Sequence, residues 1–316
     1  MKILVTGGAG FIGSHVVDCF LQAGHDVHVL DSLSHGKQEN LPPHVPLHVL
    51  DIRDSELRHL LAEERFDLVS HHAAQIDVRY SVDDPLYDAD VNILGSLNLL
   101  QGCLAGGVHK VIYASSGGAV YGEPQYLPCD ESHPIDPVSP YGVSKHVVEQ
   151  YLRQFGRLHG LRYTILRYPN VYGPRQDPLG EAGVVAIFAS RMLAGQEVHI
   201  YGTGEQERDF VYAGDCARAN LMALNGADGE VLNLGTGQGT SINALFQLMA
   251  QITGYRQSPL YLPPRRGETM RMAVDASRAR AALGWQSLVS LEAGLQRTVA
   301  AFAAVATPSP TAESRG

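Results

Sequence analysis

A tyrosine and a lysine four residues apart, Tyr141 and Lys145, are the side chains in this sequence best suited to proton transfer. Residues with this spacing lie on one face of a helix, and Pro140 suits the first turn of such a helix. A phenol with a pKa near 10 is a poor base at neutral pH, but a neighbouring ammonium favours the phenolate. The pair therefore predicts a general base. The alternative is a chance pair on an ordinary amphipathic helix.

Glycines at positions 7, 10 and 13 lie between an apolar segment, 1–5, and a predicted helix that starts at residue 11. In a strand-to-helix turn, Gly7 allows the tight turn, Gly10 lets the backbone approach a pyrophosphate, and Gly13 lets the helix pack on the sheet. The start of the helix offers unpaired N–H groups and a partial positive charge to phosphates. This arrangement predicts a dinucleotide site.

An acidic residue, Asp31, ends the next predicted strand, 26–30, and lies 18 residues after Gly13. An acidic side chain in this place accepts hydrogen bonds from the ribose hydroxyls of the adenosine. Because a carboxylate repels a 2′-phosphate, NAD is favoured over NADP. The alternative for Asp31 is a residue that only forms a turn.

Two serines, Ser115 and Ser116, follow the apolar run 109–114. A hydroxyl here could donate a hydrogen bond to the substrate oxygen at the carbon that loses its hydride. The alternative for any serine after a strand is simple turn chemistry.

The elements that must position these residues alternate between strands and helices. Strands are predicted at 2–6, 26–30, 46–50, 67–70, 109–114 and 162–167, and helices at 11–23, 54–64, 84–106 and 140–159. This alternation predicts an α/β fold with a doubly wound parallel Rossmann sheet, in which ligands bind at the carboxyl ends of the strands. Each residue discussed above follows a predicted strand or lies at the start of a helix.

The second half of the chain predicts a smaller, discontinuous substrate-binding lobe. We expect residues 1–168 to form mainly the NAD-binding domain, 169–303 mainly the lobe, with segments that return to the first domain, and 304–316 a disordered tail. Within the lobe the predicted helices are 184–194, 214–225, 241–253 and 290–303, and the predicted strand is 198–201.

Composition restricts the class of protein. A net charge of −9 without basic runs argues against a nucleic-acid partner. The four cysteines are scattered without metal-ligand spacing, so we expect free thiols and no metal site. No apolar run approaches the roughly 20 residues that cross a bilayer, and a predicted strand begins at residue 2. We therefore expect a cytoplasmic enzyme.

Several segments together carry a family resemblance over residues 1–303. They are 6–13, 31–36, 51–52, 71–75, Asn92, 115–122, Tyr141 with Lys145, and 167–175. With them the chain resembles the extended short-chain dehydrogenase/reductases that act on nucleotide sugars, particularly the UDP-glucose 4-epimerase group in its compact bacterial form. The resemblance implies NAD as cofactor, a UDP-sugar as substrate, and a homodimer formed by the helices 84–106 and 140–159.

The resemblance also implies site residues. Those implied for NAD are Gly7, Gly10, Phe11, Ile12, Gly13, Asp31, Ser32, Leu33, Ser34, His35, Gly36, Asp51, Ile52, His72, Ala73, Ala74, Gln75, Asn92, Ser115, Tyr141, Lys145 and Pro169. Those implied for the substrate are Ser116, Tyr141, Asn170, Val184, Arg191, Tyr201, Arg208 and Arg265. Ser116, Tyr141 and Lys145 would be catalytic, and the guanidinium groups of Arg208 and Arg265 suit a diphosphate. Arg175 and Arg266 are assigned no role.

The chain departs from the family at the serine, because many epimerases carry the catalytic hydroxyl where this chain has Gly117. Ser116 is therefore the candidate donor, with Ser115 behind it. The related dehydratases carry an Asp-Glu pair where this chain has Gly117 and Gly118, so only oxidation and re-reduction at C4 is expected. The expected reaction is C4 epimerisation of a UDP-hexose. The alternatives are a UDP-glucuronate 4-epimerase and a non-catalytic NAD-binding sensor.

The family resemblance also suggests a residue beside the sugar. A count from 267–268 places Met272 there, and a flexible methionine could leave room for an N-acetylated sugar. The alternative is that Met272 faces the core.

Overall fold

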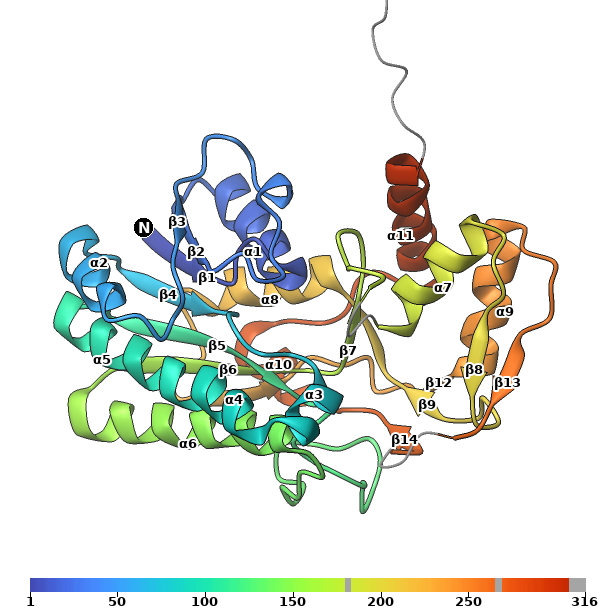
Figure 1. Ribbon diagram of the computed structural model, residues 1–316. Coiled ribbons are helices and arrows are strands. Elements are labelled where there is room, and N and C mark those ends of the chain that lie inside the picture. Colours follow the sequence, from blue (N-terminus) through green and yellow to red (C-terminus); the bar gives the residue numbers. More distant parts are fainter. Residues whose placement is uncertain (180–182, 265–268, 307–316) are drawn as a thin grey trace, which may run out of the picture.

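A seven-stranded parallel sheet forms the centre of the computed structural model, which describes residues 1–179, 183–264 and 269–306 (Figure 1). The strands lie in the order β11-β6-β5-β4-β1-β2-β3, and every neighbouring pair is parallel. Their bounds are β1 Lys2–Thr6, β2 Asp26–Asp31, β3 Leu47–Val49, β4 Leu68–His71, β5 Lys110–Ser116, β6 Arg162–Tyr168 and β11 Glu230–Asn233. The predicted doubly wound α/β fold is confirmed.

The order of the strands reverses between β1 and β4, because β2 and β3 extend to one side and β5 and β6 to the other. Open parallel sheets bind ligands at the carboxyl ends of the strands beside such a reversal. Thr6 and His71, which end these two strands, are paired in register. The loops after β1 and β4 therefore lie at the place where this fold binds ligands.

Helices cover both faces of the sheet (Figure 1). One face carries α1 (Phe11–Gln22) and α8 (Ala213–Ala223), which pack against each other. The other face carries α2 (Glu56–Glu64), α5 (Ser96–Gly106) and α6 (Pro140–His159). The four predicted helices of the first half are thus present, with ends that differ by one or two residues except at 84–106.

The predicted helix 84–106 is divided into pieces. Asp84 caps α4 (Pro85–Ala89) by accepting a hydrogen bond from the Tyr87 N–H, a π-helical turn η2 (Asp90–Gly95) follows, and α5 continues from it. A short helix that was not predicted, α3 (Val78–Asp83), precedes them. A π-helical turn inside a helix is rare and is frequently found at a functional site.

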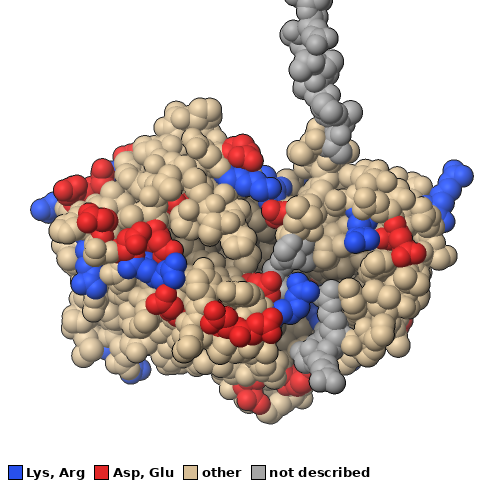
Figure 2. Space-filling model, in the orientation of Figure 1, with Lys and Arg blue, Asp and Glu red and all other residues tan. Residues whose placement is uncertain are grey.

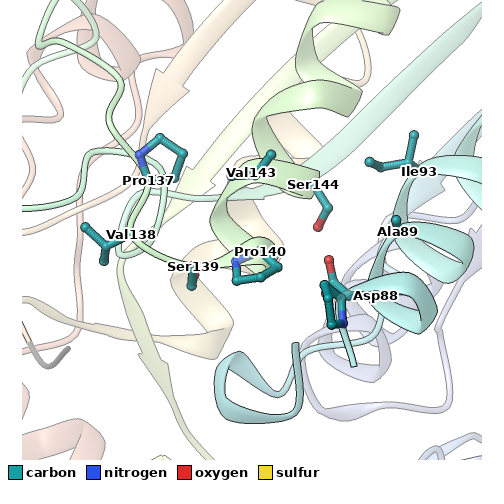
Figure 3. Close-up of a pocket in the computed structure, with 10 residues that line it drawn as sticks. Asp88, Ala89, Ile93, Pro137, Val138, Ser139, Pro140, Val143 and Ser144 are labelled. Carbon is teal, nitrogen blue, oxygen red and sulfur yellow. The ribbon is translucent and has the colours of Figure 1, made fainter. Parts of the chain in front are cut away.

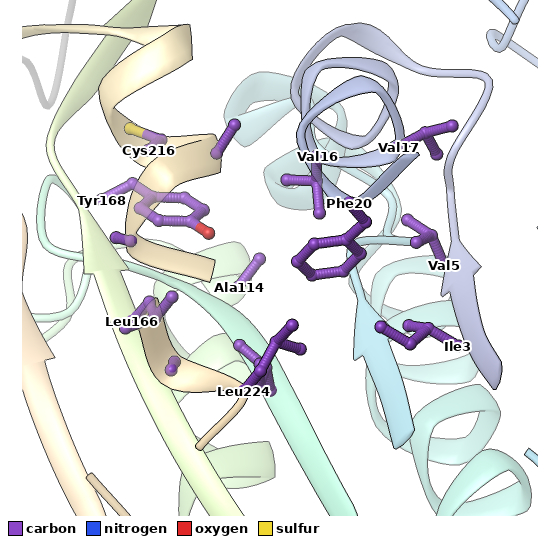
Figure 4. Close-up of a cluster of buried hydrophobic side chains, with 14 of the residues drawn as sticks. Ile3, Val5, Val16, Val17, Phe20, Ala114, Leu166, Tyr168, Cys216 and Leu224 are labelled. Atoms are coloured by element: carbon purple, nitrogen blue, oxygen red, sulfur yellow. The ribbon is translucent and has the colours of Figure 1, made fainter. Parts of the chain in front are cut away.

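Apolar side chains fill the space between the sheet and each layer of helices. On the α1 face, Val16 and Phe20 lie against Val5 of β1 and neighbouring strands, and all three side chains are fully buried (Figure 4). On the other face, Leu61 of α2 and Leu99 of α5 belong to a second cluster. Because both faces of the sheet are covered, β1 is a continuous apolar run rather than an alternating one.

The smaller lobe has its own core. Its helices α7, α9 and α11 pack together, and Phe188, Phe246 and Leu295 lie in their shared apolar cluster. Besides α8, the described helices of this half are α7 Val184–Leu193, α9 Ile242–Thr253, α10 Ser277–Leu283 and α11 Leu291–Ala306. Besides β11, the described strands are β7 Asn170–Tyr172, β8 His199–Tyr201, β9 Glu207–Arg208, β10 Phe210–Tyr212, β12 Thr240–Ser241, β13 Leu260–Leu262 and β14 Arg271–Met272.

Two elements of the second half return to the first sheet, as was expected of this half in general terms. Strand β11 pairs in parallel with β6, and α8 packs on α1. Strand β11 was not predicted, whereas the predicted helix 214–225 corresponds to α8. Residues 304–306 belong to α11, so the predicted start of the tail at 304 was wrong, and 307–316 lie outside the described residues.

Acidic and basic side chains are interspersed on the face of the molecule shown in Figure 2. Within the described ranges, no helix is both long and apolar enough to span a membrane. All four cysteines are free thiols, as expected.

Candidate active site

The glycine-rich turn joins β1 to α1 with little room to spare. Gly7 has a φ of +66°, and a Cβ on it would lie 2.6 Å from the backbone nitrogen of Ala73. A Cβ on Gly13 would clash with the carbonyl oxygen of Gly7, so the helix can approach the turn only with glycine there. Helix α1 starts at Phe11 after Gly10, and no side chain caps it. Its first N–H groups, including those of Phe11 and Ile12, therefore suit an anion.

Asp31, at the end of β2, has a buried side chain that the following loop surrounds. Its carboxylate accepts hydrogen bonds from the N–H groups of Ala9 (3.0 Å) and Leu33 (2.9 Å). Burial raises the pKa of Asp31, and these hydrogen bonds oppose that shift. A Cβ on Gly36 would lie 2.6 Å from a carboxylate oxygen, so the loop with Ser32, Ser34 and His35 closes tightly around it.

Asp51 and Ile52 follow β3, at the edge of the same sheet. The Asp51 carboxylate pairs with the Arg53 guanidinium through bonds of 2.9 and 2.7 Å, and this pairing lowers the pKa of Asp51. Ile52 is buried and lies against the backbone of Gly95 in η2. The two predicted residues thus connect the strand edge to the helix layer.

Two histidines end β4 and begin the loop after it. The buried His71 lies between the hydroxyls of Thr6 (2.7 Å) and Ser96 (2.9 Å), and burial holds its pKa well below the ordinary value. The His72 Nε2 lies 2.9 Å from Ser70 Oγ, whereas its buried Nδ1 has no hydrogen-bond partner among the described residues. Burial lowers the pKa of His72 to about 3, so its ring is neutral.

A hydrogen-bond network joins this loop to η2 and α6. The Asn92 side chain accepts from the Gln75 N–H (2.8 Å) and donates to the Gln75 carbonyl (3.0 Å) and to Asp88 (3.0 Å). Its Nδ2 also lies 3.2 Å from Ser144 Oγ on α6. The loop that contains the predicted residues Ala73, Ala74 and Gln75 is therefore held beside η2 and α6, the helix that carries Tyr141.

Helix α6 positions the predicted catalytic pair. Ser139 caps it by accepting a hydrogen bond from the Gly142 N–H, and the Tyr141 N–H donates to Ser81 Oγ at 3.2 Å. The buried Lys145 Nζ lies 5.8 Å from the centroid of the Tyr141 ring and donates to the Ala114 carbonyl at 3.0 Å. Tyr141 is partly exposed. A fixed cation beside an accessible phenol is the arrangement that favours a phenolate base.

The ammonium of Lys145 lies in a buried environment. Burial lowers the pKa of Lys145 to about 8, while the carboxylates of Asp88 and Glu149 oppose the shift. The Lys145 Nζ also lies 5.1 Å from the centroid of the buried Tyr113 ring. The side chain is therefore charged at neutral pH and loses its proton in mildly alkaline solution.

The two predicted serines differ in their surroundings. The Ser115 hydroxyl is buried and donates to Glu149 Oε1 at 2.6 Å. Ser116 is the last residue of β5 and is partly exposed, whereas the preceding residues of the strand are buried. Its side chain points to the opposite face of the sheet from that of Ser115. A Cβ on Gly118 would lie 3.9 Å from Ser116 Oγ and 4.0 Å from Asn170 Oδ1. Ser116 and Asn170, predicted from distant segments, thus lie around one point.

A buried ion pair behind Ser115 was not predicted. Both oxygens of Glu149 accept hydrogen bonds from the Arg167 guanidinium, at 2.9 and 2.5 Å, and neither side chain is significantly exposed. Although burial raises the pKa of Glu149, these bonds lower it to about 2. Arg167 also donates to the Tyr121 hydroxyl at 2.9 Å. An arginine inside the apolar strand 162–167 was the one signal in the sequence.

The residues predicted for the substrate lie on several elements of the second half. Asn170 begins β7, and Val184 begins α7. Pro169, which was predicted for NAD instead, is buried between β6 and β7. Tyr201 ends β8, and Arg208 ends β9. Their place on the substrate stays a prediction.

Three further residues have different outcomes. Arg191, near the end of α7, donates to the Glu197 carbonyl at 2.7 Å. Arg265 lies outside the described residues. Met272 is 2% exposed and packs in a cluster with Val120 and Val274, so it faces the core, and the suggestion that it lies beside the sugar was wrong.

Among the described residues, no three His, Cys, Asp or Glu side chains are arranged to hold a metal ion.

Comparisons with known proteins show the family of this chain. The profile of the NAD dependent epimerase/dehydratase family matches residues 3–235. A putative UDP-glucose 4-epimerase from Methanocaldococcus jannaschii is 50% identical over 297 residues, which cover 94% of this chain and 97% of the relative.

Two solved structures are similar over nearly the whole chain. The crystal structure of a UDP-glucose 4-epimerase from Thermotoga maritima with UDP-glucose has a TM-score of 0.96 and 51% identity, and covers 97% of this chain and 100% of its own. That of a UDP-glucose 4-epimerase from Thermus thermophilus in complex with NAD has a TM-score of 0.91 and 45% identity, and covers 96% and 99%. The chain belongs to the NAD dependent epimerase/dehydratase family.

Proposed function

We propose that this protein epimerises C4 of UDP-glucose to give UDP-galactose, and the reverse, with NAD bound throughout the cycle. The observation that carries the proposal is the buried ammonium of Lys145 beside the partly exposed phenol of Tyr141, at the end of the sheet that carries the glycine-rich turn. Relatives at 50 and 51% identity are named as UDP-glucose 4-epimerases, which supports this substrate.

The residues present fit NAD. Gly7 and Gly13 leave room for backbone alone, and the uncapped start of α1 offers N–H groups to a pyrophosphate. The Asp31 carboxylate at the end of β2 would hold the adenosine ribose, and Lys145 would hold the nicotinamide ribose. When bound, NAD supplies reversible hydride transfer at the sugar carbon.

Tyr141, Lys145 and Ser116 would then act on the C4 hydroxyl of the sugar and its proton. The Tyr141 phenolate takes the proton of the C4 hydroxyl as that carbon is oxidised, and returns it to the oxygen in the second half of the cycle. Lys145 favours the phenolate by its charge, since the ammonium lies close to the ring in a buried place. Ser116 donates a hydrogen bond to the C4 oxygen. Inversion requires the sugar to present its opposite face before re-reduction.

No second chemical step is expected in this site. Elimination or decarboxylation requires a further acid or base after the serine, and this chain has Gly117 and Gly118 there. The Gly117 N–H donates to the Tyr168 carbonyl at 2.7 Å, which holds the backbone of this segment on β6. The reaction therefore stops at epimerisation.

A homodimer formed by α4, η2, α5 and α6 is also part of the proposal. A groove of about 480 Å³ lies between α4 with η2 and the start of α6, and Ala89, Ile93 and Val143 line it (Figure 3). Close to it, Leu86 is 82% exposed and Leu94 58% exposed. Large apolar side chains exposed together are typical of an interface. Leu97 is partly buried and Leu100 packs in the core, so the last is not an interface residue.

A direct assay tests the proposed reaction. The purified protein is incubated with UDP-glucose, UDP-galactose, UDP-N-acetylglucosamine and UDP-glucuronate in turn, and the products are separated by chromatography. We expect interconversion of the first two without added NAD. Turnover of UDP-glucuronate alone would favour the alternative epimerase, absence of all turnover would favour a sensor, and stoichiometric NADH release would indicate a dehydrogenase.

A further inference from the structure

The segment 173–177, which follows β7 and which we call the strap, is tied to two elements of the first domain. Among the described residues, the Arg175 guanidinium makes three hydrogen bonds, and all of them go to residues of the first domain. Its Nη1 donates to the Asn40 carbonyl at 3.0 Å, and its Nη2 donates to Asp18 Oδ2 at 2.6 Å and to His15 Nδ1 at 3.0 Å. Asp18 and His15 lie on α1, whereas Asn40 lies in the segment between β2 and β3.

Two other contacts fasten the same segment. The His15 Nε2 lies 2.9 Å from the carbonyl oxygen of Pro174, so a neutral ring that accepts from Arg175 at Nδ1 can donate to Pro174 at Nε2. Burial lowers the pKa of His15 to about 4, which keeps the ring in this neutral form. Lys37 and Asp177 form an ion pair at 3.4 Å. The strap is therefore held at both its ends.

The two elements joined by the strap both lie against the glycine-rich turn. The carbonyl of Ala9 in that turn accepts hydrogen bonds from the Lys37 N–H (3.0 Å) and from the Asn40 side chain (2.8 Å). A Cβ on Gly173 would lie 3.6 Å from the ring of Phe11, the first residue of α1. The turn and Asp31, which would hold the dinucleotide, are thus in contact with the elements that the strap joins.

The backbone of Arg175 is in the left-handed region, with a φ of +67°. A residue other than glycine, asparagine or aspartate rarely adopts this conformation, and it persists only where surrounding contacts hold it. The three hydrogen bonds of the guanidinium are those contacts. The arginine is thus needed for its side chain, although glycine would suit the backbone better.

We propose that Arg175 retains the bound dinucleotide by fastening the strap across α1 and the segment 37–40, an inference that rests on the proposed use of NAD. Release of the cofactor then requires the contacts of Arg175 to break first. Arg175 acts through the strap and is a positioning residue, since its hydrogen bonds go to the protein itself.

The test measures release of NAD rather than turnover. Wild-type protein and variants are loaded with NAD and freed of excess by gel filtration, and an auxiliary dehydrogenase with its substrate then reports the NAD that leaves. In Arg175→Gly the guanidinium is lost while the left-handed backbone remains allowed. We expect this variant to release NAD at least about tenfold faster than the wild type, the effect of losing a charged hydrogen bond.

The control variant is Arg278→Ala, which removes a two-bond ion pair with Glu230 at the opposite edge of the sheet. It should release NAD at the wild-type rate. Asp18→Ala removes one partner of Arg175 and should also speed release. The double variant Asp18→Ala with Arg175→Gly should release NAD no faster than Arg175→Gly alone.

The outcomes separate this inference from the proposed function. Equal release rates in Arg175→Gly and Arg278→Ala would overturn the role of the strap while leaving the cofactor assignment intact. If Arg175→Gly does not fold, Asp18→Ala decides the question, and a wild-type rate of release in that variant overturns the inference. A folded wild-type protein that carries no NAD after gel filtration contradicts the proposed function itself.

Discussion

Ser115 and Ser116 are adjacent hydroxyls in different surroundings, because neighbouring residues of a strand point to opposite faces and Ser116 ends the strand. Ser115 supports the buried carboxylate of Glu149, whereas Ser116 remains accessible near Asn170. The sequence alone left both open as hydrogen-bond donors to the substrate. Their environments favour Ser116 as the hydrogen-bond donor to the substrate.

Ser116→Ala should lower kcat by about 100-fold with a smaller effect on KM, since the hydrogen bond strengthens as charge develops on the C4 oxygen. Steady-state kinetics with UDP-glucose measure both constants. Ser115→Ala is the matched variant and should act mainly on stability, because it removes one hydrogen bond to Glu149. If Ser115→Ala is the variant that loses kcat, Ser115 is the donor.

Tyr141→Phe should fold and bind UDP-sugar but lose more than about 100-fold in kcat, the usual contribution of a general base. Tyr151 lies on the same helix and is 38% exposed, so Tyr151→Phe serves as the control and should retain wild-type kinetics. Near-normal turnover in Tyr141→Phe would exclude this residue as the base.

The charge of Lys145 predicts how activity depends on pH. Its pKa of about 8 means that the ammonium is present below that pH and is lost as the pH rises through it. We therefore expect kcat to fall on the alkaline side around pH 8. Asp88→Asn removes a carboxylate that raises this pKa, so the fall should move to lower pH. A pH profile of kcat for both proteins checks the shift, and an unchanged profile in Asp88→Asn would contradict it.

At the scale of elements, the pair of Glu149 and Arg167 joins α6 to β6 and, through Ser115, to β5. It therefore holds the helix that carries Tyr141 in position against the strand that carries Ser116. The ion pair lies between elements that are distant in sequence, and neither residue belongs to the predicted site.

Glu149→Gln should destabilise the protein by about 3–5 kcal/mol, because Arg167 would remain buried without a counter-charge. Glu230→Gln removes the carboxylate of a pair whose Arg278 side chain is 52% exposed, and should cost less than about 1 kcal/mol. Chemical denaturation of the NAD-loaded proteins measures both. Similar losses in the two variants would mean that burial of the first pair has no special effect.

At the scale of the whole molecule, the site lies where segments of both halves meet. β7 and β10 of the second half are paired beside the carboxyl end of β6, and the strap connects β7 to α1. The helix layer on the far side of the sheet carries the exposed leucines of the proposed dimer. The division of the chain into domains at residue 168 stays a prediction.

A variant with Leu86→Glu and Leu94→Glu should be monomeric in light scattering at micromolar concentration, because each leucine buried in an interface stabilises it by roughly 1.5–3 kcal/mol. Leu288 in the second half is 64% exposed and offers a control, and Leu288→Glu should leave the dimer unchanged. A wild-type protein that is already monomeric would contradict the proposed assembly.

Much of this protein could be predicted from the sequence, because the signals are local. Apolar runs and helical spacing predict the strands and helices of the first half within a few residues, except in 78–106, where α3 was missed and the predicted helix is divided. The proposed chemistry of Tyr141 with Lys145 depends on one helix, and that of Gly7 to Gly13 on one turn, so spacing along the chain was enough to predict these residues as candidates.

Tertiary structure alone decided which distant residues meet. Glu149 and Arg167 lie 18 residues apart, and Asp18 and Arg175 lie 157 apart, so no local spacing links either pair. A count along the sequence placed Met272 beside the sugar, but its side chain packs in a buried apolar cluster. Such contacts depend on which strands become neighbours in the sheet and on how loops cross it, and burial then makes a charged pair strong or a side chain inaccessible. The strand order is a property of the whole chain.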